Sequence, residues 1–283
     1  QDEIGPAPAP FAWLAFGSQA REEQSIKTDQ DNGLVYADDA PAGADAWFRD
    51  LARIVCDGLD ACGYTYCPGK IMATTDDWRQ PLSGWLRHFR DWASVPDPEA
   101  VLRVSIFFDL RAIHGDQQLV ARIVQALGEC GSGRGRGIFI AALARQAASY
   151  DVPLGFFRRF VLASKGEHRE TLEIKASGLV PLTDLVRARA LEAGVSVPGT
   201  QARIAHMLDA GRLSRRDADR LAGAHRLLAG LRIRLHAEQV RRGEAPHNHL
   251  DPRAISHAER AALRDAFMVI REAQKGLSLD YSQ

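Results

Sequence analysis

The spacing of apolar and polar residues predicts two structurally different halves of the chain. In the first half, the apolar runs FAWLAFG and DNGLVYA predict buried strands. Between Ala44 and Cys62, apolar residues recur at steps of three and four, which indicates an amphipathic helix. The segment VLRVSIFFDLR, residues 101–111, predicts a further strand, and residues 116–130 return to helical periodicity.

The second half is helical almost throughout by the same criterion. Prolines and glycines such as Pro198-Gly199 separate the periodic segments, as expected at helix ends. The predicted helices are Ile138–Ser149, Thr183–Ala193, Gln201–Ala210, Ser214–Arg242 and Ser256–Lys275. We therefore expect a half that mixes strands and helices, followed by an all-helical bundle.

The domain boundaries follow from these two halves. We predict a Pro/Ala-rich linker over residues 1–10, an N-terminal domain over residues 11–135 and a helical domain over residues 136–283. The segment GSGRGRG, residues 131–137, lies at the boundary. Its glycine spacing is like that of a dinucleotide-binding loop, but it follows a helix rather than a strand, so a flexible hinge is the favoured interpretation.

Composition and charge exclude several classes of protein. The 283 residues are 46% hydrophobic and 25% charged, which is typical of a globular chain with one or two domains. Lys plus Arg and Asp plus Glu number 36 each, so no basic field indicates a nucleic-acid partner. No apolar run approaches the roughly 20 residues that cross a bilayer, and no signal peptide is visible. The four cysteines lack metal-binding spacing, so we expect buried, reduced thiols in a cytoplasmic protein.

One segment, GSQAREEQSIKTDQDNGLVY at residues 17–36, carries the candidate chemistry. Asp29 and Asp31 are separated by one residue, so both carboxylates would point to the same face of an extended strand. Two like charges on one face repel unless a cation lies between them, and Mg²⁺ prefers oxygen ligands and phosphates. Upstream, Gly17 and Ser18 could form a strand-to-helix turn that holds phosphate oxygens, with Ser18 as the helix N-cap.

Residues outside the aspartate pair decide between a site and an ordinary turn. By itself an Asp-x-Asp pair is weak evidence, and the segment TDQDN favours a polar turn. Arg21 lies one turn into the predicted short helix, where it could pair with a phosphate. Asp109, at the end of the predicted strand VSIFFD, could supply a third carboxylate. Together these residues raise a metal-dependent phosphoryl or nucleotidyl transfer above the polar-turn interpretation.

These motifs resemble those of a known group of enzymes. The arrangement G-S-x2-R, then T-D-x-D and an apolar strand, is similar to the signature of the polymerase-β-like nucleotidyltransferase superfamily. More narrowly, the segments that begin at Gly17 (GSQAREEQSIKTDQDNGLVY), Tyr66 (YCPGKIMATTDDWR) and Phe107 (FFDLRAIHGD) resemble a bacterial nucleotidyltransferase family, domain-of-unknown-function family 294. That family is similar to the uridylyltransferases that modify the PII nitrogen-signalling protein.

The resemblance extends through the helical half and implies a fold. The segments PLGFFRRFVL, GEHRETLEIK, LVPLTDLVRARAL and RRGEAPHNHLDP resemble the substrate-binding domain of the same family. The implied fold class is α+β, in which a polymerase-β-like nucleotidyltransferase fold, a small mixed sheet with flanking helices, precedes an all-helical bundle. The resemblance therefore covers nearly the whole chain from Phe11.

The resemblance also implies a role for each site residue. Gly17 and Ser18 would hold the triphosphate, and Asp29 and Asp31 would bind Mg²⁺. Asp109 would help to deprotonate the attacking hydroxyl and would bind a second metal ion.

Three cations extend the predicted nucleotide-binding site. Arg21, Arg111 and Lys175 would lie near the phosphates or the base of the nucleotide. Surface or interdomain salt bridges are an equal alternative for each of them, and exposed pairs of that kind contribute little to stability.

We predict an Mg²⁺-dependent transferase, with two ions bound alongside the NTP. It would move a nucleoside monophosphate from ATP or UTP to an acceptor hydroxyl and release pyrophosphate. By analogy with protein adenylyl- and uridylyltransferases, the acceptor would be a protein side chain such as a tyrosine, for example in a signalling protein. We expect neither a nucleic-acid nor a membrane partner.

The surroundings of the domain and two rival functions stay open. CBS or cyclic-nucleotide-binding domains often precede the domains of this family, so such a domain is a candidate upstream neighbour in the full-length protein. The first rival is a regulatory module that binds nucleotide with little or no turnover. The second is a transferase that acts on nucleic acid, against which the zero net charge argues.

Overall fold

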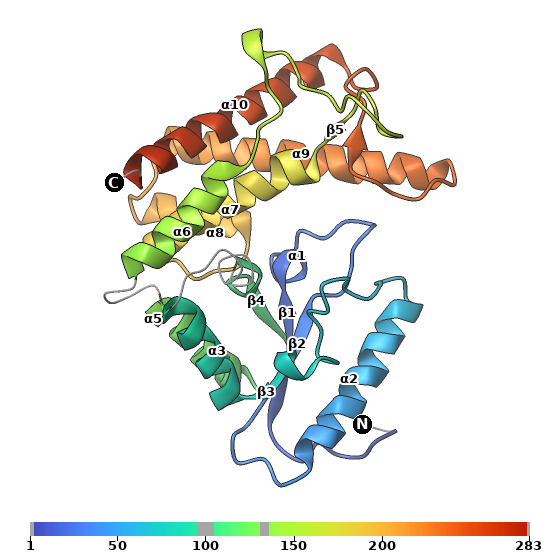
Figure 1. Cartoon of the computed structure of the whole chain (residues 1–283), viewed down its shortest axis with the longest axis vertical. Helices are drawn as coiled ribbons and strands as arrows, with labels where there is room; N and C mark the ends of the chain where they lie inside the picture. Colours follow the sequence, from blue (N-terminus) through green and yellow to red (C-terminus); the bar gives the residue numbers. More distant parts are fainter. Residues whose placement is uncertain (1–2, 95–104, 131–135, 282–283) are drawn as a thin grey trace. The chain divides into compact units, whose positions relative to one another are not determined.

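The computed structural model describes residues 3–94, 105–130 and 136–281, which form two compact units (Figure 1). Among the described residues, the first unit comprises 3–24, 28–139 and 196–199, and the second comprises 25–27, 140–195 and the residues from 200 onward. Neither unit is continuous in sequence, because each contains a short segment that the other surrounds.

The first unit is built on a four-stranded mixed sheet in the order β3-β2-β1-β4. The central strand β1 (Phe11–Phe16) pairs antiparallel with β2 (Asn32–Tyr36) and with β4 (Leu110–Gly115), whereas β3 (Arg79–Pro81) runs parallel to β2. The strands predicted from FAWLAFG and DNGLVYA are confirmed. A small mixed sheet, followed by a helical C-terminal region, confirms the predicted fold class.

Helices flank this sheet on both sides (Figure 1). Helix α2 (Ala44–Ala61) confirms the predicted amphipathic helix and covers one face. Helices α3 (Leu82–Ser94) and α5 (Gln117–Cys130) lie on the other face, and the short 3-10 helix η1 (Asp76–Trp78) precedes β3.

Side chains of β1 alternate between the two helical layers. Trp13 packs into the same core cluster as Phe48 of α2. Phe16, three residues on, packs against Trp85 of α3 with the ring centroids 5.7 Å apart. Burial on both faces explains why FAWLAF is a continuous apolar run rather than an alternating one.

Of the strand predicted over residues 101–111, the structure bears out only residues 110–111 among those that it describes. Residues 105–107 are helical, and β4 begins only at Leu110. Phe107 is fully buried, with its ring centroid 4.7 Å from that of Phe16. The aromatic residues of this segment, which are typical of strands, are therefore buried in the core without forming part of a strand pair.

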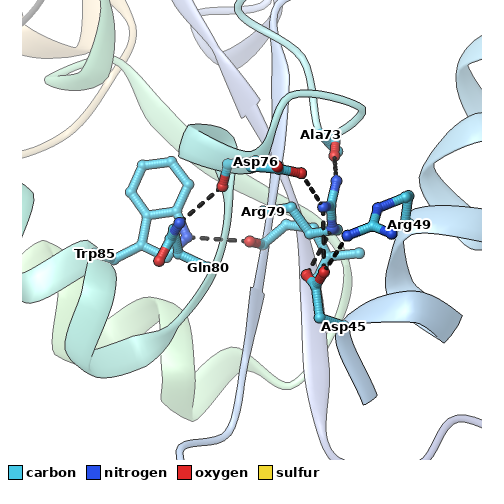
Figure 2. Close-up of polar contacts among 8 residues, drawn as sticks. Asp45, Arg49, Ala73, Asp76, Arg79, Gln80 and Trp85 are labelled. Carbon is cyan, nitrogen blue, oxygen red and sulfur yellow. Dashed lines mark hydrogen bonds and ion pairs between the residues drawn. The ribbon is translucent and has the colours of Figure 1, made fainter. Parts of the chain in front are cut away.

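A buried arginine joins the edge of the sheet to α2 (Figure 2). The Arg79 side chain is fully buried, and its Nε donates to Asp45 Oδ1 of α2 at 2.9 Å. Its other donors reach the Ala73 carbonyl oxygen at 3.0 Å and the Asp76 carboxylate. Beside Arg79, the pKa of the Asp76 carboxyl is lowered, chiefly by this hydrogen bond. The guanidinium thus holds the loop before β3 against the start of α2.

Among the described residues, the second unit consists of helices, the loops that join them and short strand pairing. Strands β5 (Leu172–Glu173) and β6 (His249–Leu250) pair antiparallel, which the helical pattern did not predict. The predicted helices are all present, with ends shifted by a few residues. They are α6 (Arg136–Ser149), α7 (Val180–Glu192), α8 (Thr200–Asp209), α9 (Arg215–Arg241) and α10 (His257–Asp280), joined by the short helices η2 (Phe156–Arg158) and η3 (Lys175–Leu179).

The two long helices of this unit begin at serine caps. Ser214 Oγ accepts from the Asp217 amide at 3.1 Å at the start of α9. At the start of α10, Ser256 Oγ accepts from the Glu259 amide at 3.2 Å, and the Glu259 carboxylate accepts from the Ser256 amide at 2.9 Å. This reciprocal capping box satisfies two backbone donors that the first turn leaves without partners.

The sequence also makes predictions about the cysteines and the boundary segment. Cys56 and Cys67 are buried free thiols, as expected, but Cys62 is exposed at the end of α2. The predicted hinge GSGRGRG falls mainly on residues 131–135, outside the described residues. Within the described ranges, no helix combines the length and apolar character needed to cross a membrane.

Candidate functional site

The candidate site is built around the turn that ends β1. Gly17 follows the strand with a positive φ of 53°, and its amide donates to the Asp109 carbonyl oxygen at 3.1 Å. One residue earlier, the Phe16 amide donates to the Asp31 carbonyl oxygen at 2.9 Å. The backbones of Asp31 and Asp109 therefore flank the end of β1 from its two sides.

The position of Asp109 follows from the direction of β4. The structure places Asp109 before β4 rather than at the end of a strand, which corrects the sequence-based placement. Because β4 runs antiparallel to β1, its first residue, Leu110, pairs with Phe16, the last residue of β1. Asp109, which precedes β4, therefore lies at the end of β1. A residue at the end of a strand parallel to β1 would lie at the same edge of the sheet.

Ser18 is not the helix N-cap that the sequence predicts. Helix α1 spans Gly17–Ala20, and Phe16 occupies the cap position with an extended backbone and no side-chain cap. Because the strand runs straight into the helix at Phe16, the helix starts one residue before Ser18. Ser18 lies directly after the Gly17 turn, half-buried in the first turn of α1.

Asp29 and Asp31 lie on a segment whose side chains alternate. Gln30 and Asn32 are buried, and Gln30 Nε2 donates to the Tyr64 carbonyl oxygen at 2.7 Å. Asn32 Nδ2 donates to Gln30 Oε1 at 3.3 Å, so this polar pair anchors the segment on its inner face. Asp29 and Asp31, which alternate with these two residues, are half-buried, as expected for the opposite face of an extended chain.

A third potential ligand lies beside the two carboxylates. Among the described residues, Asp29, Asp31 and Cys67 bring one ligand atom each within 4.8 Å of one another. Burial raises the pKa of the Cys67 thiol to about 11, and the charge of Asp31 adds to the effect. The thiol is therefore neutral at neutral pH, so the two carboxylates are the donors of this group that fit Mg²⁺.

Sequence reasoning missed Cys67 as a neighbour of the aspartates. The signal that could have indicated it is the turn CPG in a segment of irregular pattern. A bridge between Asp29 and Thr65 runs parallel, and the Gln30 amide donates to the Thr65 carbonyl oxygen at 2.9 Å. This pairing aligns the loop with the aspartate segment and brings its cysteine to the carboxylates.

Asp109 is a buried carboxylate held by an arginine. Its side chain is fully buried and forms an ion pair with Arg21 Nη1. Arg21 Nε donates to Glu23 Oε2 at 2.7 Å, so one guanidinium bridges two carboxylates. Asp109 is not a member of the ligand group formed by the other two aspartates. Arg21 thus contacts the third carboxylate of the predicted triad.

The other two predicted cations lie in different units. Arg111, on β4, pairs with Glu22 Oε1 at 3.2 Å and donates to the Gln19 carbonyl oxygen at 3.2 Å. It therefore lies beside the loop that follows α1. Lys175 is exposed at the start of η3 and belongs to the second unit.

Two family models match the chain. The model described as "Putative nucleotidyltransferase DUF294" matches residues 1–99, and the model described as "Putative nucleotidyltransferase substrate binding domain" matches residues 137–281. A search of curated proteins finds no match. The first model covers the segment from Gly17 to Asp31 and also Cys67, whereas Asp109 and Arg111 lie between the two matched ranges.

Proposed function

Because the chain belongs to the nucleotidyltransferase family DUF294, together with its substrate-binding domain, we propose that it transfers a nucleoside monophosphate from an NTP to an acceptor hydroxyl. The observation that carries the proposal is the pair Asp29 and Asp31, which meet on one face of an extended segment beside the Gly17 turn. Paired carboxylates next to a glycine turn suit the binding of a metal-bound triphosphate.

Asp29 and Asp31 would hold Mg²⁺, and Asp109 would hold a second ion when the NTP is bound. The ions would supply positive charge that neutralises the phosphates of the bound nucleotide. In support, the carboxylate oxygens are hard donors of the kind that Mg²⁺ prefers, and those of the first two aspartates lie within 4.8 Å of each other.

Gly17 and Ser18 would bind the triphosphate. A Cβ atom on Gly17 would lie 3.4 Å from Asp31 Oδ2, so the missing side chain leaves room beside that carboxylate. The Ser18 hydroxyl would donate to a phosphate oxygen from the first turn of α1. Arg111 and Lys175 would add positive charge near the phosphates or the base.

The transfer step needs one proton acceptor among the residues of the chain. The acceptor oxygen forms a bond to the α-phosphorus, the bond from that phosphorus to the bridging oxygen of pyrophosphate breaks, and the hydroxyl proton passes to Asp109. Arg21 would orient Asp109 for this role through the ion pair that joins them. Most of the rate enhancement would come from positioning and from electrostatic stabilisation.

The acceptor class follows by analogy, as for protein adenylyl- and uridylyltransferases: a protein hydroxyl such as that of a tyrosine, with ATP or UTP as donor. The test is intact-mass spectrometry of candidate bacterial signalling proteins after incubation with this protein, Mg²⁺ and each NTP in turn. A mass gain of one nucleotide residue, matched by an equal amount of pyrophosphate, supports the proposal. Nucleotide binding with no pyrophosphate for any NTP and acceptor overturns it.

A second candidate function rests on the Arg21–Asp109 ion pair. If Arg21 stays on Asp109 in the nucleotide complex, the carboxylate cannot accept a proton, and the domain would sense nucleotide without turnover. Comparison of wild type with Arg21→Gln distinguishes the two. An inactive wild type and a variant that releases pyrophosphate indicate a regulatory module, whereas an active wild type and a slower variant indicate an enzyme in which Arg21 positions Asp109.

A further inference from the structure

The ligand group at the aspartate pair contains an atom that Mg²⁺ chemistry does not use. Cys67 Sγ lies within 4.8 Å of a carboxylate oxygen of Asp29 and of Asp31. Magnesium takes oxygen ligands, whereas thiolate sulfur selects softer ions such as Zn²⁺. The composition of the group therefore fits a different cation better than the one that the transfer reaction needs.

The Cys67 side chain is buried in the turn that carries it. Cys67 is 7% exposed, so water has little access to its sulfur. A Cβ atom on Gly69 would lie 3.6 Å from that sulfur, which shows how closely the turn wraps it. A buried thiol of this kind stays protonated until a bound cation replaces its proton.

The same turn is fixed in place by further hydrogen bonds. The Lys70 amide donates to the Cys67 carbonyl oxygen at 2.9 Å, and the Cys67 amide contacts Met72 Sδ at 3.4 Å. Hydrogen bonds therefore hold the loop that carries the cysteine in place.

We propose that Asp29, Asp31 and Cys67 together bind a thiophilic divalent cation of the Zn²⁺ or Cd²⁺ class at the aspartate pair. On binding, the S–H bond of Cys67 breaks, the proton passes to solvent, and a sulfur–metal bond forms with no change of oxidation state. Zinc binds sulfur at about 2.3 Å and carboxylate oxygen at about 2.0–2.2 Å, so the three ligand atoms would draw together around the ion.

Inhibition of the transfer reaction by this cation rests on the proposed function, whereas binding of the cation does not. An ion held by a thiolate and two carboxylates would displace Mg²⁺ from Asp29 and Asp31 and would inhibit nucleotidyl transfer. Thiolate ligands select Zn²⁺ over Mg²⁺, so Zn²⁺ would compete for the two aspartates with an excess of Mg²⁺. Binding of Zn²⁺ at this site would then inhibit nucleotidyl transfer.

The binding test uses Co²⁺ as a spectroscopic substitute for Zn²⁺ on the metal-free full chain. A sulfur-to-cobalt charge-transfer band is expected in wild type and in Cys62→Ser, which removes an exposed thiol away from the aspartates. In Cys67→Ser the band should vanish, and the Zn²⁺ affinity measured by competition should fall by roughly 100-fold or more. No band in wild type, or a band that persists in Cys67→Ser, overturns the proposal.

The activity arm separates this inference from the proposed function. Inhibition by Zn²⁺ is measured for each protein relative to its own rate with Mg²⁺ alone, and Cys67→Ser should need at least about 10-fold more Zn²⁺ than Cys62→Ser. A cobalt–sulfur band without any Mg²⁺-dependent transfer supports this site while contradicting the proposed function. Mg²⁺-dependent transfer without a cobalt–sulfur band supports the proposed function and contradicts this metal site.

Discussion

At the scale of single residues, Gly17 combines an unusual backbone conformation with a position beside the proposed metal ligands. Its φ of 53° is one that side chains rarely adopt, and a Cβ atom there would touch the Asp31 carboxylate. Gly17→Ala should therefore cost about 1 kcal/mol in the free energy of unfolding. It should also lower the rate of nucleotidyl transfer by roughly 10-fold or more, because the added methyl group fills space beside that carboxylate where the triphosphate would bind.

A second glycine provides the matched control for this prediction. Gly43 has a φ of 86°, with nothing within 4 Å of the position of a Cβ atom. Gly43→Ala should destabilise the protein by a similar amount, as measured by urea unfolding, and should leave the transfer rate unchanged. Equal rates for the two variants would show that the space beside Asp31 does not matter for the reaction.

At the scale of elements, the ion pair of Arg79 joins β3 to α2. Asp45→Ala leaves the buried guanidinium with one carboxylate fewer, and should cost about 2 kcal/mol in the free energy of unfolding. In an Arg79→Met background the same change should cost clearly less, because the buried charge has been removed. Urea unfolding of the four proteins of this cycle measures the coupling.

The control for the Arg79 cycle lies on the same helix. Asp50 is exposed on α2, 3.8 Å from Arg53, and Asp50→Ala should change stability by no more than about 0.5 kcal/mol. A cost for Asp45→Ala that is as small as this, or that is equal in both backgrounds, would mean that Arg79 does not hold the two elements together.

The capping box of α10 predicts a pH dependence of stability. The pKa of the Glu259 carboxyl is lowered from 4.5 to about 2, chiefly by the Ser256 amide, with help from the Ser256 hydroxyl and Arg234. Since the folded state holds this pKa below its unfolded value, the contribution is fully present above pH 4.5 and is lost as pH falls toward about 2.

Glu259→Gln isolates this contribution. The difference in unfolding free energy between wild type and variant should be constant above pH 4.5 and should shrink steadily toward pH 2. Denaturant unfolding at a series of pH values measures it. A difference that stays constant across the acid range would exclude Glu259 as a titrating cap.

The sequence predicted local periodicity better than long-range partners. The helices of both halves and the shared face of Asp29 and Asp31 follow from repeats of three to four and of two residues. The ion pair of Arg79 with Asp45 joins residues 34 positions apart, and no local pattern encodes it. Cys67 reaches the aspartates through a loop of irregular sequence, so its place depends on tertiary pairing alone.

Asp109 lies beside Gly17 at the end of β1, although the sequence assigned it to the wrong place in a strand. The sequence placed it at the end of a strand, whereas the structure places it before one. Both arrangements bring Asp109 to the same end of β1. The last residue of a strand parallel to β1 and the residue before a strand antiparallel to β1 lie at the same edge of the sheet. The β-prone residues before Asp109 were misread because burial in the core favours the same aromatic side chains as strand pairing does.

At the scale of the whole molecule, the two compact units and the two family matches divide the chain in a similar way. The first match, to residue 99, includes the aspartate pair, and the second begins at residue 137, close to residue 140, where the first long segment of the second unit begins. We propose that the predicted domains, residues 11–135 and 136–283, divide catalysis from recognition of the acceptor. Acceptor choice would then depend on the helical unit, and metal use on the first.

The most direct test of the account is pyrophosphate release from NTPs with Mg²⁺ by wild type and by Asp31→Asn. The amide keeps the shape of the side chain but removes the charge that would hold the ion, so the melting temperature should be unchanged or slightly higher. Wild type should release pyrophosphate with at least one NTP when the acceptor is present, and the variant should be slower by at least about 100-fold. A variant that stays folded and keeps the full wild-type rate would contradict the metal site and the mechanism built on it.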